Sequence, residues 1–327
     1  MAVVTSQIIS RYYDDFRNTE VTFTKDIIRT LAMDPRQIYI KCAGSQWPCI
    51  VNSSSFSQVR IIVGTKGGAF QAIAKKDPPP VSIRFAFYQS DGQLLSLFIS
   101  GKVMNIASYM NSKEMAVVTI NYTQKPPDDF IEMIGHLIDA NNNAIRRKED
   151  RIVITPDALK KLGIPRKETV IVIQNVPRHC ILQDLSFGGA KVVLMGLSQF
   201  LLNKEVEMRI EFDDPHEVIP LKGIIMNTIP VEGRKDIVIA NIKFNEESIS
   251  LSYKIHINNY LITVRAKDLN TTFEGDTVEQ PVVQPATTQQ TPQQVTPQPA
   301  AGDTSSAQES NTQQAETAPS GSQETAQ

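Results

Sequence analysis

The sequence RRKEDR at positions 146–151, together with DLSFGG at positions 184–189, decides the fold of this chain. The first stretch contains the spacing R-x-x-x-R, and the second contains D-x-S-x-x-G. Taken separately, a charged run is usually a solvated turn, and Asp and Ser commonly form a turn between strands. An accidental occurrence of both patterns in this order has a probability below about one in a hundred. The pair therefore predicts one site built from two distant segments.

The arginines of the first stretch suit an anionic ligand that carries a purine. Arg147 and Arg151 hold the R-x-x-x-R spacing, and Arg146 directly precedes them. Arginine offers planar, forked donors that match phosphate oxygens and the O6 and N7 acceptors of guanine, and its guanidinium also stacks on a base. These residues predict a clamp for phosphates and guanine.

The second stretch complements this clamp. An ionised Asp184 accepts hydrogen bonds from N1 and N2 of guanine, and the Ser186 hydroxyl can bond a phosphate or a base edge. Gly189 has no side chain, so we expect it to leave room for a ligand to approach the backbone. The residue types predict recognition of a guanine nucleotide, without catalytic machinery.

At these residues the chain resembles the PilZ family, bacterial receptors for the second messenger cyclic di-GMP, and it matches every motif position. The resemblance implies a six-stranded β-barrel over residues 145–267. It also implies that residues 141–151 are a hinge that becomes ordered when its arginines close on the ligand. The additional Arg146 implies binding of an intercalated pair of cyclic di-GMP molecules.

Residues 1–140 are similar to the PilZN-type domain of flagellar brake proteins, which implies an N-terminal split barrel. In such two-domain receptors, ligand binding at the hinge changes the arrangement of the domains, and a protein partner reads the change. The resemblance therefore implies an unidentified protein partner, with a flagellar motor component as one candidate, and a role in regulating motility.

The hydrophobic pattern outside the motifs favours all-β structure with a few helices. Short runs rich in β-branched residues alternate with turn residues. Positions 141–143 are all Asn, which resists both helix and strand, so we place the domain boundary there. We expect two tandem β-barrels, the second capped by a C-terminal helix, with strands at 37–41, 49–52, 59–63, 81–88, 94–103, 115–121, 151–154, 169–173, 179–184, 191–194, 206–212, 221–228 and 237–244, and helices at 8–16, 128–140, 156–163 and 246–267.

Residues 268–327 are predicted to be a disordered tail. The segment is rich in Gln, Thr and Pro, and Phe273 is its only aromatic residue, so it cannot bury enough apolar surface to offset the entropy of ordering. All 33 Lys and Arg precede it, so the net charge of −2 conceals a mildly basic body. That excess is too small and too scattered to predict a specific nucleic-acid partner.

Enzyme and metal sites have little support in the sequence. The patterns C-x-x-C, H-E-x-x-H and G-x-S-x-G do not occur. His179 and Cys180 are neighbours on a predicted strand, where their side chains point to opposite faces, so they make a poor catalytic dyad. We therefore expect no enzyme, no metal and no cofactor besides the ligand.

The cysteines and the apolar runs indicate in which cellular compartment the chain resides. Cys42, Cys49 and Cys180 are an odd and sparse set, which suggests a reducing environment. The apolar runs are far shorter than the ~18 residues that a spanning helix needs. We therefore expect a soluble, cytoplasmic chain with no membrane span.

Together these patterns predict a cyclic di-GMP effector that regulates a protein partner. Two alternatives stay open: a PilZ-like scaffolding protein that binds no nucleotide, and a weak nucleic-acid binder. A titration with cyclic di-GMP separates the first from a receptor, and steep salt dependence without preference for the cyclic dinucleotide would indicate the second.

Overall fold

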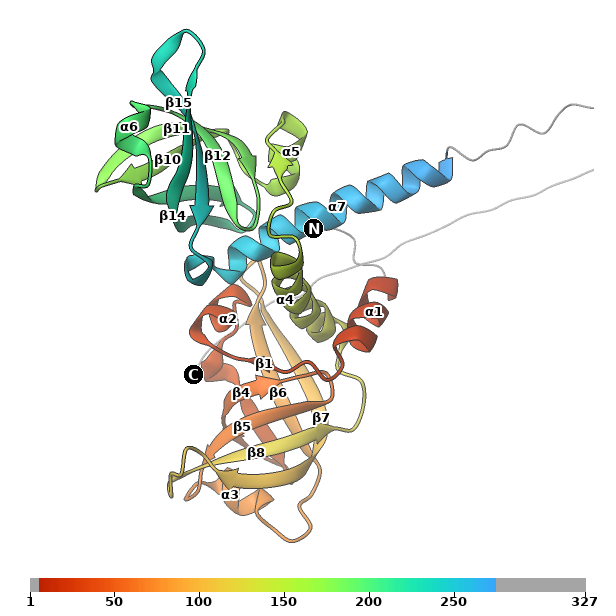
Figure 1. The fold of residues 1–327 in the computed structure, drawn as a ribbon. Helices are drawn as coiled ribbons and strands as arrows, with labels where there is room; N and C mark the ends of the chain where they lie inside the picture. The colour runs from red at the N-terminus through yellow and green to blue at the C-terminus, as the bar shows by residue number, and fades with distance from the viewer. Residues whose placement is uncertain (1–5, 275–327) are drawn as a thin grey trace, which may run out of the picture. The chain divides into compact units, whose positions relative to one another are not determined.

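A computed structural model describes residues 6–274, and strands predominate in it, as expected (Figure 1). The first series of elements extends to Arg146. It comprises α1 (Ser6–Phe16), β1 (Val21–Thr22), α2 (Lys25–Thr30), the 3-10 turn η1 (Pro35–Gln37), β2 (Tyr39–Cys42), β3 (Ser45–Pro48), β4 (Ile50–Ser54), β5 (Gln58–Gly64), α3 (Gly68–Ile73), β6 (Val81–Tyr88), β7 (Leu94–Ser108), β8 (Met115–Tyr122) and α4 (Asp128–Arg146).

The eight strands of this series form one antiparallel sheet in the order β1-β4-β5-β8-β7-β6-β2-β3. In the part of the chain that the structure describes, no pairing joins β1 to β3, so the sheet has two free edges, as a split barrel does. Alternate residues of β6 are buried, which is the period of a strand with one face on a core. In that core, the ring centroid of Phe85 lies 4.9 Å from that of Phe130 on α4.

The second series comprises β9 (Ile152–Val153), α5 (Pro156–Leu162), β10 (Glu168–Ile173), β11 (Val176–Leu185), β12 (Gly189–Met195), α6 (Ser198–Leu201), β13 (Glu205–Asp213), β14 (His216–Val231), β15 (Arg234–Phe244), the 3-10 turn η2 (Glu246–Ser248) and α7 (Leu251–Glu274). Its strands pair in the order β10-β13-β14-β15-β12-β11, and β10 also pairs with β11. This last pairing closes the predicted six-stranded barrel. Strand β9 pairs with the end of β11, beyond the residues of β11 that pair with β10.

Two helices of the second series agree with the sequence. The inserted helix α5 begins after Thr155, whose hydroxyl accepts a hydrogen bond from the Ala158 amide, and ends at Gly163, whose φ of 69° is the left-handed conformation that favours glycine. The barrel is capped by α7, which places Tyr253 and Ile257 in the barrel core. The ends of α7 differ from the predicted 246–267: the helix begins at Leu251, after the 3-10 turn η2, and continues to Glu274. Residues 268–274 of the predicted disordered tail are therefore helical, and the remainder of that tail lies outside the described residues.

The helix predicted at 128–140 is longer than expected. Helix α4 continues through Asn141, Asn142 and Asn143 to Arg146, so the expectation that these asparagines interrupt regular structure is wrong. The Asn143 side chain donates a 2.8 Å hydrogen bond to the side-chain oxygen of Asn258 on α7, and Lys254 donates one of 2.9 Å to Asn141. Asn favours turns because its side chain competes for the backbone. Here α7 supplies other partners for two of the three amides, so the helix persists.

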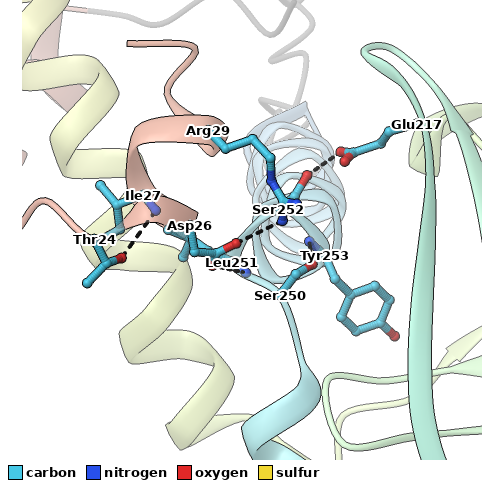
Figure 2. Close-up of polar contacts among 9 residues, drawn as sticks. All are labelled: Thr24, Asp26, Ile27, Arg29, Glu217, Ser250, Leu251, Ser252 and Tyr253. Atoms are coloured by element: carbon cyan, nitrogen blue, oxygen red, sulfur yellow. Dashed lines mark hydrogen bonds and ion pairs between the residues drawn. The ribbon is translucent and has the colours of Figure 1, made fainter. Parts of the chain in front are cut away.

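Figure 2 shows how the first turn of α7 is held. The Leu251 amide donates a 3.3 Å hydrogen bond to Oδ2 of Asp26, which comes from α2, and the Ser252 hydroxyl donates one to Glu217 of β14. Carboxylates suit this position, because the first amides of a helix lack partners and carry partial positive charge. The start of α7 is therefore tied to both series of elements.

Candidate functional site

Strand pairing brings the two motifs together. Arg147 is the C-terminal cap of α4, and Arg151 directly precedes β9. Because β9 pairs with the end of β11, Val153 lies opposite Asp184. The R-x-x-x-R segment thus lies beside D-x-S-x-x-G, although the chain forms α5 and β10 between them.

The motifs meet at an ion pair between Arg151 and Asp184. Nη1 of Arg151 donates a 2.6 Å hydrogen bond to Oδ1 of Asp184. The Asp184 side chain is only 13% exposed, whereas Arg151 is 40% exposed and retains donors that face solvent. Arg147 pairs with Asp150 at 3.5 Å, and Arg146 is exposed on the last turn of α4. The Arg151 guanidinium therefore lies against a largely buried carboxylate, while Arg147 pairs within its own segment.

Ser186 and Gly189 lie in the same turn, but their contacts differ from those expected. Ser186 is buried, and its hydroxyl donates a 3.2 Å hydrogen bond to the Gly189 carbonyl, so it holds the turn. A Cβ on Gly189 would lie 2.3 Å from the carbonyl oxygen of Ile242 on β15. The glycine is thus needed for the approach of two strands, and in the structure its missing side chain does not open space toward a ligand.

The barrel wall beside Asp184 carries a cation that the sequence reasoning missed. In the pairing of β11 with β12, Lys191 lies directly opposite Asp184, and Asn241 of β15 lies opposite Lys191. Residues opposite each other in a sheet share a face. The two-residue period of β12 could have placed Lys191 on the outer wall, but its pairing with Asp184 depends on the strand register.

Lys148 and Glu246 are further residues that the motifs did not reveal. The Lys148 carbonyl accepts a 3.1 Å hydrogen bond from the amide of Gly188, and the Lys148 ammonium bonds a carboxylate oxygen of Glu246. The hydrogen bond and positive charge of Lys148 hold the pKa of the Glu246 carboxyl below its usual value. These contacts join the first motif, the second motif and η2.

Tyr253 supports the second motif from inside the barrel. Its hydroxyl donates a 2.6 Å hydrogen bond to the Ser186 carbonyl. Full burial raises the pKa of this phenol well above its usual value, so it stays a donor at every ordinary pH. The turn that presents Asp184 therefore depends on a side chain of α7.

Replacing Tyr253 with Phe is expected to lower the free energy of unfolding by about 1 to 3 kcal/mol, because the buried Ser186 carbonyl loses this donor while the ring volume is kept. Chemical denaturation of both proteins measures the difference. Tyr260→Phe is the matched control on the same helix, where the tyrosine is only partly buried. Equal stability of Tyr253→Phe and the unchanged protein would contradict a supporting role.

A large groove on the barrel lies apart from the motifs. It has a volume of about 1250 Å³ and borders Lys243 and Glu246, but contains no motif residue. Its lining mixes four basic with four acidic side chains, so it offers no preference for an anion. The motif residues therefore take no part in this groove.

Metal-binding groups, spanning helices and reactive thiols were the other kinds of site to consider in residues 6–274. No group of three or more His, Cys, Asp or Glu side chains in this part could hold a metal ion, and no helix there is long and apolar enough to cross a membrane. His179 is exposed and Cys180 is buried on β11, so they face opposite sides of the strand, as expected. Burial raises the pKa of the Cys180 thiol to about 12, which suppresses the nucleophilic thiolate.

Comparison with known proteins identifies the family of this chain. The PilZN3 domain family matches residues 7–141, and the PilZ domain family matches residues 145–263. A protein of Treponema denticola described as a cyclic di-GMP binding protein is 43% identical over 281 residues, which cover 85% of this chain and 89% of that protein. The chain belongs to the PilZ family.

Two solved structures are similar to this PilZ protein. Borreliella burgdorferi PlzA, solved in complex with c-di-GMP, is 22% identical with a TM-score of 0.35, and the match covers 78% of this chain and 98% of PlzA. MrkH of K. pneumonia in its apo state is 11% identical with a TM-score of 0.28, and the match covers 81% of this chain and 94% of MrkH. The matched PilZ region of the present chain includes Arg147, Arg151 and the whole second motif.

Proposed function

We propose that this PilZ protein is a receptor that binds cyclic di-GMP where its two motifs meet, and that it performs no catalysis. The observation that carries the proposal is the contact of Arg151 with Asp184, which brings a forked cation and a guanine-reading carboxylate to one place. The Treponema denticola relative, described as a cyclic di-GMP binding protein, supports the choice of ligand. The sparse, buried thiols suit a cytoplasmic location.

Each site residue has a role in this proposal. A phosphate of the ligand replaces Asp184 as the partner of Arg151, and Arg147 clamps phosphate and guanine beside it. The freed Asp184 carboxylate accepts hydrogen bonds from the N1 and N2 hydrogens of guanine. Ser186 and Gly189 hold the turn that presents Asp184. Arg146 contacts a second, stacked ligand molecule.

The response to the ligand starts in the first motif. The backbone at 147–151 forms neither helix nor strand between α4 and β9, so its arginine side chains can rearrange without breaking a strand pairing. We propose that ligand binding closes these arginines on the ligand and changes the arrangement of the two domains. The hinge predicted at 141–151 is then restricted to 147–151, because α4 is helical through Arg146. A protein partner then reads the change, with regulation of motility as the favoured process.

Calorimetric titration of the full chain with cyclic di-GMP tests the proposal. We expect saturable binding with two ligand molecules per chain, and no comparable binding of linear di-GMP or GMP. Scattering curves with and without ligand test the rearrangement. A flat titration trace would overturn the receptor function, and identical scattering curves from a saturated protein would overturn the hinge.

One observation favours a second candidate, a scaffolding PilZ protein that binds no nucleotide. Arg151 and Asp184 pair with each other, as the members of a purely structural ion pair do. A flat trace would support that function. Binding that weakens steeply with salt and ignores the cyclic dinucleotide would instead indicate nucleic acid.

A further inference from the structure

Gly188 joins the two motifs through its backbone. Its amide donates a 3.1 Å hydrogen bond to the carbonyl of Lys148, which lies between the arginines of the first motif. Its carbonyl accepts a 2.8 Å hydrogen bond from the amide of Phe244, at the end of β15. One residue of the D-x-S-x-x-G turn thus connects the arginine segment to the strand that precedes η2.

The side chain of Lys148 lies across Gly188. A Cβ on Gly188 would lie 2.8 Å from Cγ and 3.2 Å from Cε of Lys148, so the lysine stem occupies the space that a side chain at 188 would need. Beyond the glycine, the ammonium reaches the Glu246 carboxylate of η2. Lys148 is 30% exposed and Glu246 is 68% exposed, so this ion pair fixes position more than it adds stability.

We propose that Lys148, Gly188 and Glu246 form a clasp that sets the affinity for cyclic di-GMP by holding the arginine segment against the second motif. Lys148 is a positioning residue in this proposal, which rests on the proposed function. Glu246 anchors Lys148, and neither side chain touches the ligand. The clasp reduces the conformational freedom that Arg147 and Arg151 would lose on binding.

The direction in which one substitution changes the affinity for cyclic di-GMP distinguishes a positioning role from a purely electrostatic one. Cyclic di-GMP is a dianion, so removing a nearby negative charge should tighten binding if charge alone matters. Glu246→Gln removes such a charge and also the anchor of Lys148. If the clasp positions the arginines, this variant binds more weakly despite its more favourable net charge.

Glu247→Gln is the matched control. Glu247 is the exposed neighbour of Glu246, and the structure gives its side chain no polar contact among residues 6–274. We expect Glu246→Gln to weaken affinity for cyclic di-GMP by about two- to fivefold in calorimetry, and Glu247→Gln to leave it unchanged or tighter. Melting temperatures of the unliganded variants verify that the folded domain is equally stable.

Lys148 completes a double-mutant cycle. We expect Lys148→Met to weaken binding as Glu246→Gln does, the two changes together to weaken it no further, and Lys148→Arg to restore most of the affinity. If Glu246→Gln binds as Glu247→Gln does while Lys148→Met binds weakly, Lys148 touches the ligand and the clasp is wrong. If the unchanged protein does not bind at all, the proposed function fails instead.

Discussion

Replacing Arg151 with Ala is expected to weaken the binding of cyclic di-GMP by about one to three orders of magnitude, because the site loses charge-assisted hydrogen bonds to phosphate or guanine. Arg147→Ala should have an effect of similar size. Calorimetric titration measures both. The loss should exceed that of any other single substitution at the surface of the barrel, because these side chains carry the forked donors of the first motif.

Two further variants show whether the loss is specific. Arg151→Lys keeps a positive charge beside Asp184 but removes the planar fork, so its affinity should lie between those of the unchanged protein and Arg151→Ala. Arg166→Ala removes an exposed arginine of the same domain that pairs with Glu211, and it should bind normally. Affinity of Arg151→Ala equal to that of Arg166→Ala would rule out the assigned site.

Replacing Gly189 with Ala is expected to destabilise the protein by about 3 kcal/mol and to lower its melting temperature by roughly 10 °C. The added Cβ would lie 2.3 Å from the Ile242 carbonyl oxygen, a backbone atom of the paired strand that cannot turn aside as a side chain can. To relieve this clash, β12 and β15 would have to move apart at Gly189, where the second motif ends and β12 begins.

Gly64→Ala is the matched control for this substitution. Gly64 also lies on a strand, but the nearest atom to an added Cβ, the Glu114 carbonyl oxygen, is 3.9 Å away, which is ordinary contact. This variant should keep its stability. If Gly189→Ala melts normally yet loses cyclic di-GMP, the glycine serves the ligand directly, as its motif position alone had suggested.

Most of the fold could be predicted from the strand pattern and the two motifs. The β-branched runs placed β6 and β8 nearly to the residue, and buried positions alternate with more exposed ones along most of both strands, as in a sheet with one face on a core. Gly163 marked the end of α5 through local capping chemistry, which needs no tertiary information. The short elements α2, α3 and α6 were not predicted, because so few residues leave no detectable period.

Tertiary contacts account for what the sequence could not reveal. Asn141 and Asn143 lie in a helix because α7 supplies partners for their amides. Ser186 points into the fold, since its hydroxyl bonds the Gly189 carbonyl. The role of Lys148 could not be predicted, because only the folded structure brings the amide of Gly188 to the Lys148 carbonyl. Motif spacing identified which residues belong together, but not which of them face the solvent.

Because α4 continues without a break to Arg146, few insertions within this helix would be tolerated. A helix turns by about 100° and advances about 1.5 Å with each residue. Inserting one residue after Asn143 would swing Arg146 to another side of the helix, and inserting one before Asn141 would carry that amide away from Lys254. Additions close to whole turns would restore the direction of Arg146, but each added turn would still move it about 5.4 Å along the helix axis, so the length of α4 is fixed as well as its phase.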